Sequence, residues 1–192
     1  MKKVLVLTAH PDDLELACGG TVARFVDEGV EVTNLIVCSN VPHKKYVPES
    51  SKILGFNPLY LEHRDESITR EVVAEIEGLI DISSYDLLIT HWKEDWHQDH
   101  RFCHDLGNSL RRKQPLNVWY MNAYPYCQKY TSFDANVFVD ITKYIEQKKN
   151  SILCYKNVPT KWAKDTEHLT AYRGAFIETQ HAEIFKADTL IV

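Results

Sequence analysis

The sequence predicts an α/β fold with a mostly parallel sheet and helices on both faces. Short apolar, β-branched runs alternate with longer segments whose apolar residues recur at helical spacing. The length of 192 residues suits one domain with a single core. No internal repeat, low-complexity stretch or linker divides the chain. We therefore expect one domain over residues 1–192, with a Rossmann-like three-layer architecture.

Each expected element follows from its own pattern of apolar residues. The first part of the chain predicts a strand over 4–9, a helix over 14–26 that stops at Gly29, a strand over 32–37, a loop with Pro42 and Pro48, a short helix up to Gly55, and a strand around 59–61. The second part predicts a helix over 72–80, a strand over 86–90, a helix over 102–110, strands over 118–120 and 137–139, and a helix over 141–155. The remaining C-terminal third is expected to be less regular.

Composition and charge exclude several classes of protein. The formal charge of −5, without a stripe of lysine or arginine, argues against a nucleic-acid partner. No apolar run approaches the roughly 20 residues needed to cross a bilayer. The apolar run at the N-terminus leads directly into a polar cluster, so we expect it to be part of the fold rather than a targeting segment. These features indicate a cytoplasmic protein.

The five cysteines contain no CxxC pair and are widely spaced. This pattern is typical of a reduced protein rather than of a disulfide scaffold or a cysteine-ligated zinc site. Cys103 lies three residues after His100, which leaves a catalytic thiol as an alternative. A small buried thiol on an apolar helix face is the more common case.

Two short clusters combine histidine with carboxylate, and each follows a predicted strand. The first is the hexapeptide His-Pro-Asp-Asp-Leu-Glu over 10–15, and the second is His-Gln-Asp-His over 97–100. In open α/β sheets the ligand crevice lies outside the carboxyl ends of the strands. Two such ends can therefore bring imidazole and carboxylate groups together around one divalent metal ion.

The residue types in the two clusters suit metal-dependent hydrolysis. Catalytic zinc sites use three protein ligands from histidine and carboxylate and leave one position open, although other divalent first-row metals accept the same ligands. Asp12 and Asp13 point to different sides if the backbone is extended, so that one can bind metal while the other faces substrate. His97 and His100 share one face if their segment is helical. General acid and base candidates are therefore present.

Simpler explanations exist for each cluster alone. An Asp-Asp pair after a strand is often a helix N-cap, and a His-x-x-His pattern is often accidental. The occurrence of both clusters at strand ends favours a metal site. His91 ends its predicted strand, and whether it lines the site or bonds to backbone is left open. Gly19 and Gly20 are attributed to close packing, because no phosphate-binding motif surrounds them.

The chain resembles a known family in the residues that form these clusters. Ala-His-Pro-Asp-Asp-x-Glu over 9–15, followed by His-x-Asp-His-Arg over 97–101, is similar to the paired signatures of the LmbE-like/PIG-L family of zinc-dependent N-deacetylases. Weaker similarities are Leu-Gly at 54–55, Asp65, Phe-Val-Asp-Ile over 138–141, and Ala-Glu-x-Phe over 182–185. The resemblance runs in the expected order over nearly the whole chain.

The resemblance implies a role for each residue of the motifs. It makes His10, Asp13 and His100 the metal ligands, and Asp12 the general base. It makes His97 the residue that stabilises the oxyanion or protonates the departing amine. Asp99 would hold the second ring nitrogen of a histidine, with Glu15 and Arg101 as structural supports. The implied cofactor is Zn²⁺, and the implied reaction is removal of an N-acetyl group from an N-acetylglucosamine-type sugar or its conjugate.

Substrate recognition is the part that the resemblance defines least. The segment 41–46 departs from the arginine-containing pattern of the family and offers lysines, which lack the bidentate fork of arginine. Asp65, His181 and Lys45 are candidate substrate-binding residues. A deacylase acting on a non-sugar amine in secondary metabolism and a non-catalytic metal- or sugar-binding protein are the alternatives. The predicted partner is a small amino-sugar substrate. No membrane span is expected, and whether the protein forms a homo-oligomer is left open.

Overall fold

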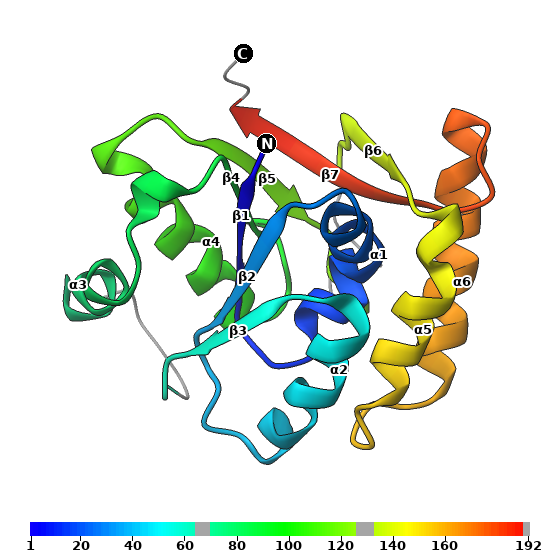
Figure 1. Cartoon of the computed structure of the whole chain (residues 1–192), viewed down its shortest axis with the longest axis horizontal. Coiled ribbons are helices and arrows are strands. Elements are labelled where there is room, and N and C mark those ends of the chain that lie inside the picture. The colour runs from blue at the N-terminus through cyan, green and yellow to red at the C-terminus, as the bar shows by residue number, and fades with distance from the viewer. Residues whose placement is uncertain (64–69, 126–132, 190–192) are drawn as a thin grey trace.

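A seven-stranded sheet forms the centre of the computed structural model, which describes residues 1–63, 70–125 and 133–189 (Figure 1). The strand order is β3-β2-β1-β4-β5-β7-β6. Strands β1 to β5 are parallel, and β7 is antiparallel to both β5 and β6. The predicted α/β class with a mostly parallel sheet is confirmed. No helix of these described residues combines the length and the apolar character needed to span a membrane.

Strands and helices alternate along the chain. The strands are β1 (Lys3–Thr8), β2 (Glu31–Ile36), β3 (Asn57–Tyr60), β4 (Leu87–His91), β5 (Asn117–Met121), β6 (Val137–Asp140) and β7 (Ala182–Thr189). The α-helices are α1 (Asp13–Asp27), α2 (Val47–Leu54), α3 (Arg70–Leu79), α4 (Gln98–Leu110), α5 (Ile145–Leu153) and α6 (Lys161–Gly174). Short 3₁₀ turns include η1 (Pro42–Tyr46), η4 (Thr142–Tyr144) and η5 (Ala175–Ile177).

Strand β1 is the point at which the winding of the sheet reverses. The chain runs outwards from β1 through β2 to β3, and then returns to place β4 on the other side of β1. Leu5 consequently pairs with Thr33 of β2 and with Leu88 of β4. At such a reversal the connections leave β1 and β4 in opposite directions, which opens a crevice at their carboxyl ends. Both predicted clusters follow these two strands.

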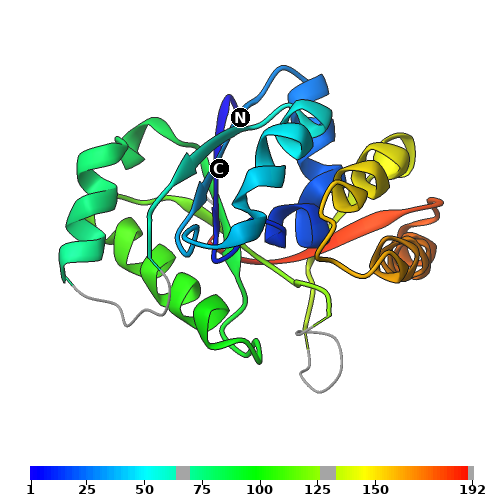
Figure 2. The same cartoon turned by 90° about the horizontal axis from the view of Figure 1, so that it is seen from below.

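The alternation of side chains along β1 divides the core into two layers. Val4 and Val6 pack with residues of α1, α2 and α5 on one face, whereas Leu5 and Leu7 pack with residues of α3 and α4 on the other. All four of these side chains are fully buried. Figure 2 shows α3 and α4 on one side of the sheet and the remaining helices on the other. This is the expected three-layer arrangement.

The structure corrects two expectations about local structure. The C-terminal third is regular, because it forms the 14-residue helix α6 and the eight-residue strand β7. The sequence of α6 has few apolar residues, and buried Glu183 interrupts the apolar pattern of β7. Pro48 lies in the first turn of α2 rather than in a loop. Proline is tolerated there because the first helical amides have no partner within the helix.

Gly20 lies where α1 crosses the residue that follows β6. A Cβ atom built on Gly20 would lie 2.7 Å from Cδ1 and 2.9 Å from Cβ of Ile141. Cβ of Ile141 is fixed to the backbone, so the neighbour cannot simply rotate away. Close packing, rather than nucleotide binding, thus accounts for a glycine at this position.

We predict that Gly20→Ala lowers the free energy of unfolding by about 1–3 kcal/mol, because the added methyl group overpacks this contact. Gly78→Ala in α3 is the matched control, since nothing lies within 4 Å of its added Cβ. There, alanine should stabilise the helix by about 0.5–1 kcal/mol. Urea unfolding of both variants measures the difference. Equal effects of the two substitutions would contradict the packing argument.

Candidate metal centre

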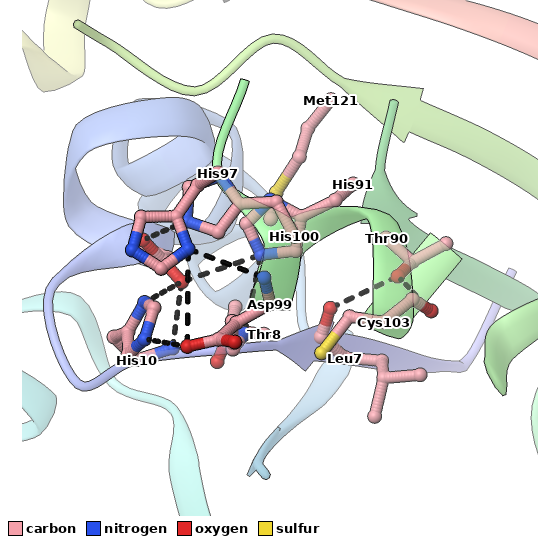
Figure 3. Close-up of polar contacts among 12 residues, drawn as sticks. Leu7, Thr8, His10, Thr90, His91, His97, Asp99, His100, Cys103 and Met121 are labelled. Atoms are coloured by element: carbon pink, nitrogen blue, oxygen red, sulfur yellow. Dashed lines mark hydrogen bonds and ion pairs between the residues drawn. The ribbon is translucent and has the colours of Figure 1, made fainter. Parts of the chain in front are cut away.

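The two sequence clusters meet at the carboxyl ends of β1 and β4. His10 lies two residues after β1, and Asp13 is the first residue of α1. His97 is the N-cap of α4 and His100 lies in its first turn. Figure 3 shows His10, His97, Asp99 and His100 converging although they come from two distant parts of the chain. The ring centroids of His97 and His100 are 4.8 Å apart and the rings are stacked.

The Asp13 carboxylate lies between two imidazoles. Its Oδ2 is 3.6 Å from Nδ1 of His10, and its Oδ1 is 3.2 Å from Nε2 of His100. The outer ring nitrogens each contact another carboxylate: Nε2 of His10 is 2.9 Å from Oδ2 of Asp99, and Nδ1 of His100 is 2.9 Å from Oδ2 of Asp95. This carboxylate–histidine arrangement fixes ring orientation and tautomer in metal sites.

The donor set fits a divalent cation. A tetrahedral site with bonds of about 2.0–2.2 Å needs ligand atoms roughly 3.4 Å apart, which is close to the separations around Asp13. Among the described residues, three groups have ligand atoms that all lie within 4.8 Å of one another. These groups are His10/His97/His100, Asp13/His91/His100 and His10/Cys38/Asp99. The trio His10, Asp13 and His100 is not itself one of these groups: His100 belongs to both of the first two, His10 to the first and Asp13 to the second.

His91, whose position the sequence left open, lies inside this cluster. Its side chain is fully buried and stacks on His100 with a centroid distance of 4.0 Å. The Ala9 amide donates to its Nε2, which also lies 3.3 Å from Oδ2 of Asp13. His91 therefore holds the end of β1 and contacts the central carboxylate at the same time.

Burial and mutual charge shift the titration of these groups strongly. Burial alone would lower the pKa of His100, but Asp13 and Asp95 outweigh it and raise that pKa to about 10. Burial opposes ionisation of Asp13, yet His100 and His91 hold its pKa well below the usual range. Burial lowers the pKa of His91 to about 4, with His100 adding to the effect. Burial and neighbouring Asp13 raise the pKa of Asp12 to about 6.

Asp95 supports the second cluster, and the sequence analysis did not select it. Its Oδ1 accepts from the His97 amide at 2.8 Å, while its Oδ2 faces His100. The Arg101 guanidinium donates to the carbonyl oxygens of Asp95 and Trp96 at 2.7 and 2.9 Å. Arg101 thus contacts the loop that carries Asp95 and Trp96. The one signal in the sequence was a carboxylate two residues before His97.

The simpler explanations for individual residues do not apply. Asp12 occupies the N-cap position of α1 but makes no capping hydrogen bond with its side chain. The carboxylate of Asp13 instead accepts from the His10 amide at 2.7 Å. Cys103 is fully buried, and burial raises the pKa of its thiol far above the ordinary value. A thiolate nucleophile is therefore not available at this position.

A cavity of about 400 Å³ opens beside the two clusters. Its walls combine residues of the centre with the start of α1, the region before and within η1, and the connection between α5 and α6. The lining residues are His10, Asp12, Asp13, Leu16, Val41, His43, His97, Asn157, Val158 and Trp162. The sequence analysis did not predict the wall formed by Asn157, Val158 and Trp162, because nothing in the local pattern marks that connection as part of a site.

Lys45 and His181, two of the candidate substrate-binding residues, do not line this cavity. Lys45 is exposed, and its ammonium lies 5.0 Å from the ring centroid of Tyr46. His181 does not lie on a helix: it precedes β7, and its Nδ1 is 3.1 Å from Oγ1 of Thr170. Asp65 lies outside the described residues.

Fold and site together define an α/β protein with a histidine–carboxylate centre of the metal-binding type at the reversal of its sheet. The family model "PIG-L: GlcNAc-PI de-N-acetylase" matches residues 5–52. The matched segment contains the whole first cluster. The resemblance to the PIG-L family inferred from the sequence is confirmed.

Two curated relatives are named as deacetylases. The chain is 34% identical over 62 residues to a 1D-myo-inositol 2-acetamido-2-deoxy-alpha-D-glucopyranoside deacetylase of Tsukamurella paurometabola, covering 28% of this chain but only 20% of that relative's length. It is 23% identical over 218 residues to the diacetylchitobiose deacetylase of Thermococcus kodakarensis, covering 95% of this chain and 82% of the relative.

Two solved structures share the fold over the whole chain. The conserved protein TT1542 from Thermus thermophilus has a TM-score of 0.84 at 23% identity, covering 100% of this chain and 97% of that one. GalB, a 4-carboxy-2-hydroxymuconate hydratase from Pseudomonas putida, has a TM-score of 0.87 at 14% identity, covering 100% and 98%. At these identities the likeness concerns the fold alone.

We predict that Asp95→Asn weakens metal binding roughly 10–100-fold, because the second ring nitrogen of His100 loses its carboxylate partner. Competitive titration with a chromophoric chelator measures the dissociation constant. Asp105→Asn, at an exposed position of α4, is the control and should keep the original affinity. The predicted support of His100 by Asp95 is wrong if both variants bind the metal like the parent protein.

Proposed function

We propose that this chain is a metal-dependent hydrolase that removes an N-acetyl group from an N-acetylglucosamine-type sugar or its conjugate. The observation that carries the proposal is that Asp13 contacts both His10 and His100. His10, Asp12, Asp13 and His97 line one cavity, and His100 lies buried behind it. The matching family description and the names of the two curated relatives support the same chemistry. We also propose that residues 1–192 act as one cytoplasmic deacetylase domain.

His10, Asp13 and His100 are the proposed ligands of Zn²⁺, although another divalent first-row metal suits the same donors. The bound ion would supply a water of lowered pKa and polarise the acyl carbonyl. Asp99 and Asp95 would hold the two ligand histidines through their outer nitrogens. Asp13 would be oriented by the His10 amide.

Asp12 is the proposed proton-transfer residue, and His97 is the proposed stabiliser of the oxyanion. Asp12 lines the cavity next to the ligands and is not engaged as a helix cap, so its carboxylate is available to take a proton from the attacking water. The Asp99 amide donates to Nδ1 of His97 at 3.2 Å. In the neutral ring this bond leaves the proton on Nε2, which can donate a hydrogen bond to the developing oxyanion. The proton that Asp12 takes from the attacking water can then pass to the departing amine.

The cavity wall suggests how an amino sugar would be held. Trp162 offers an aromatic surface on which the apolar face of a pyranose ring can pack, and Asn157 offers a polar side chain beside it. The fold by itself does not separate deacetylation from the reaction of a hydratase, which also uses this architecture. The proposal therefore rests on the residues of the centre and not on the overall fold.

We predict opposite effects for the two histidines of the second cluster. His97→Ala should lower kcat by about 10²–10³-fold, because a hydrogen-bond donor to the oxyanion is lost, while the metal content is retained. His100→Ala should lower the metal content, because a ligand is lost. Elemental analysis of each variant and a fluorescamine assay for the amine released from N-acetylglucosamine conjugates measure the two effects. Asp12→Asn should retain metal and lose turnover. Equal metal loss in both histidine variants would reject this division of roles.

We predict that Trp162→Ala raises KM for an N-acetylglucosamine conjugate roughly 10-fold with a smaller change in kcat, because ring stacking contributes to substrate binding rather than to the reaction. Trp96→Ala is the control: this tryptophan is 53% exposed and does not line the cavity. The same amine-release assay over a range of substrate concentrations gives both constants. A fall in kcat alone would refute a binding role for Trp162.

A further inference from the structure

A buried ion pair between α5 and β7 lies against α1, the helix that begins in the first cluster. Nζ of Lys148 in α5 is 2.6 Å from Oε1 of Glu183 in β7, and both side chains are at most 1% exposed. Neither residue lines the cavity described above. A buried ion pair is costly to desolvate, so its geometry has to be satisfied by further hydrogen bonds.

Both partners of the ion pair bind the backbone of α1. Lys148 donates to the carbonyl oxygens of Glu15 and Leu16 at 2.9 and 3.0 Å. Oε1 of Glu183 accepts from the Gly20 amide at 3.0 Å, and its Oε2 accepts from the Thr21 amide at 2.7 Å. Lys148 thus binds carbonyl oxygens near the start of α1, and Glu183 binds amides of the turn that follows.

These contacts lie at a break in the helix. Cys18 has φ −139° and ψ 19°, which lie outside the helical range. In an unbroken helix the Gly20 amide would donate to the Leu16 carbonyl. Here Lys148 donates to the Leu16 carbonyl, and Glu183 accepts from the Gly20 amide. The ion pair therefore stands between two backbone groups that would otherwise bond to each other. Side chains inserted in this way are a known cause of helix kinks.

The segment before the break carries the reactive residues. Asp12 precedes it as the N-cap and Asp13 is its first residue. The direction of this short segment relative to the rest of α1 is therefore determined by the break.

We propose that Lys148 and Glu183 are positioning residues, which fix the kink of α1 and thereby aim Asp12 and Asp13 at the metal centre. This inference rests on the proposed function. It assigns a role to the Ala-Glu-x-Phe segment over 182–185, which the sequence analysis selected only by resemblance. The pair does not contact the reacting groups, so its effect has to pass through the backbone of α1.

The test uses three variants of the whole chain: Glu183→Gln, Lys148→Met, and the double variant that combines these two substitutions. Each is compared with the control variant Ile76→Ala. Ile76 is a fully buried residue of α3 in the opposite core layer, and it provides a destabilised control that leaves α1 untouched. Co²⁺ is the probe, because its d–d absorption reports coordination geometry without any turnover. Melting temperature, Co²⁺ dissociation constant, Co²⁺ spectrum, kcat and KM are measured for each variant well below its melting temperature.

Glu183→Gln should weaken Co²⁺ binding roughly 10–100-fold, alter the d–d spectrum and lower kcat more than it raises KM. Ile76→Ala should keep all four properties of the parent despite its lower melting temperature. In the double variant no unpaired charge remains buried, so the melting temperature should recover relative to Lys148→Met, whereas the altered spectrum should persist.

The inference is overturned if the control loses Co²⁺ affinity like Glu183→Gln, or if the spectrum of the double variant returns to that of the parent together with its stability. Should the double variant not fold, Glu183→Gln against Ile76→Ala decides the question. Failure of the proposed function has a different signature: the parent protein would bind Co²⁺ but release no amine. A parent protein that binds no Co²⁺ would reject both.

Discussion

The site depends on one contact, in which the carboxylate of Asp13 meets histidines from a different strand connection. Asp13 follows β1, whereas His91 is the last residue of β4 and His100 follows it in α4. The three meet because β1 and β4 are neighbours at the reversal of the sheet. A different strand order would separate the groups, whatever their sequence motifs. The two apolar layers around β1 fix this neighbourhood, since the alternating side chains of β1 are fully buried against helices on both faces. The core therefore determines the site, and the motifs supply its chemistry.

The sequence predicted what is encoded by local periodicity or by a motif. The helix 14–26 and the strands around 4–9 and 86–90 follow from apolar spacing, and the structure confirms them as α1, β1 and β4. Asp95 was missed because its contact with Nδ1 of His100 forms only when the loop before α4 is folded, and no sequence motif marks it. Helix α6 and strand β7 were missed because buried polar groups such as Glu183 contradict the apolar pattern, and their partner lies on another element.

The comparison with GalB shows how little the fold alone determines. A hydratase shares this architecture with a TM-score of 0.87, so the sheet and its reversal are compatible with more than one reaction. A reaction therefore has to be inferred from the side chains of each chain's own site. In this chain those are Asp12, His97 and the wall with Trp162. Each lines the cavity, which is why the proposed reaction is built on them.

The charges of the centre explain why a cation belongs there. Asp13, Asp95 and Asp99 are each less than 5% exposed, and three buried carboxylates without compensation would be strongly unfavourable. Without metal, protons supply part of that compensation, because Asp13 and Asp95 raise the pKa of His100 to about 10. A histidine ligand must lose such a proton before it binds metal. Metal and proton therefore compete for the same negative environment. A divalent ion would replace the proton on Nε2 of His100, with Asp13 as its ligand and Asp95 beside the other ring nitrogen.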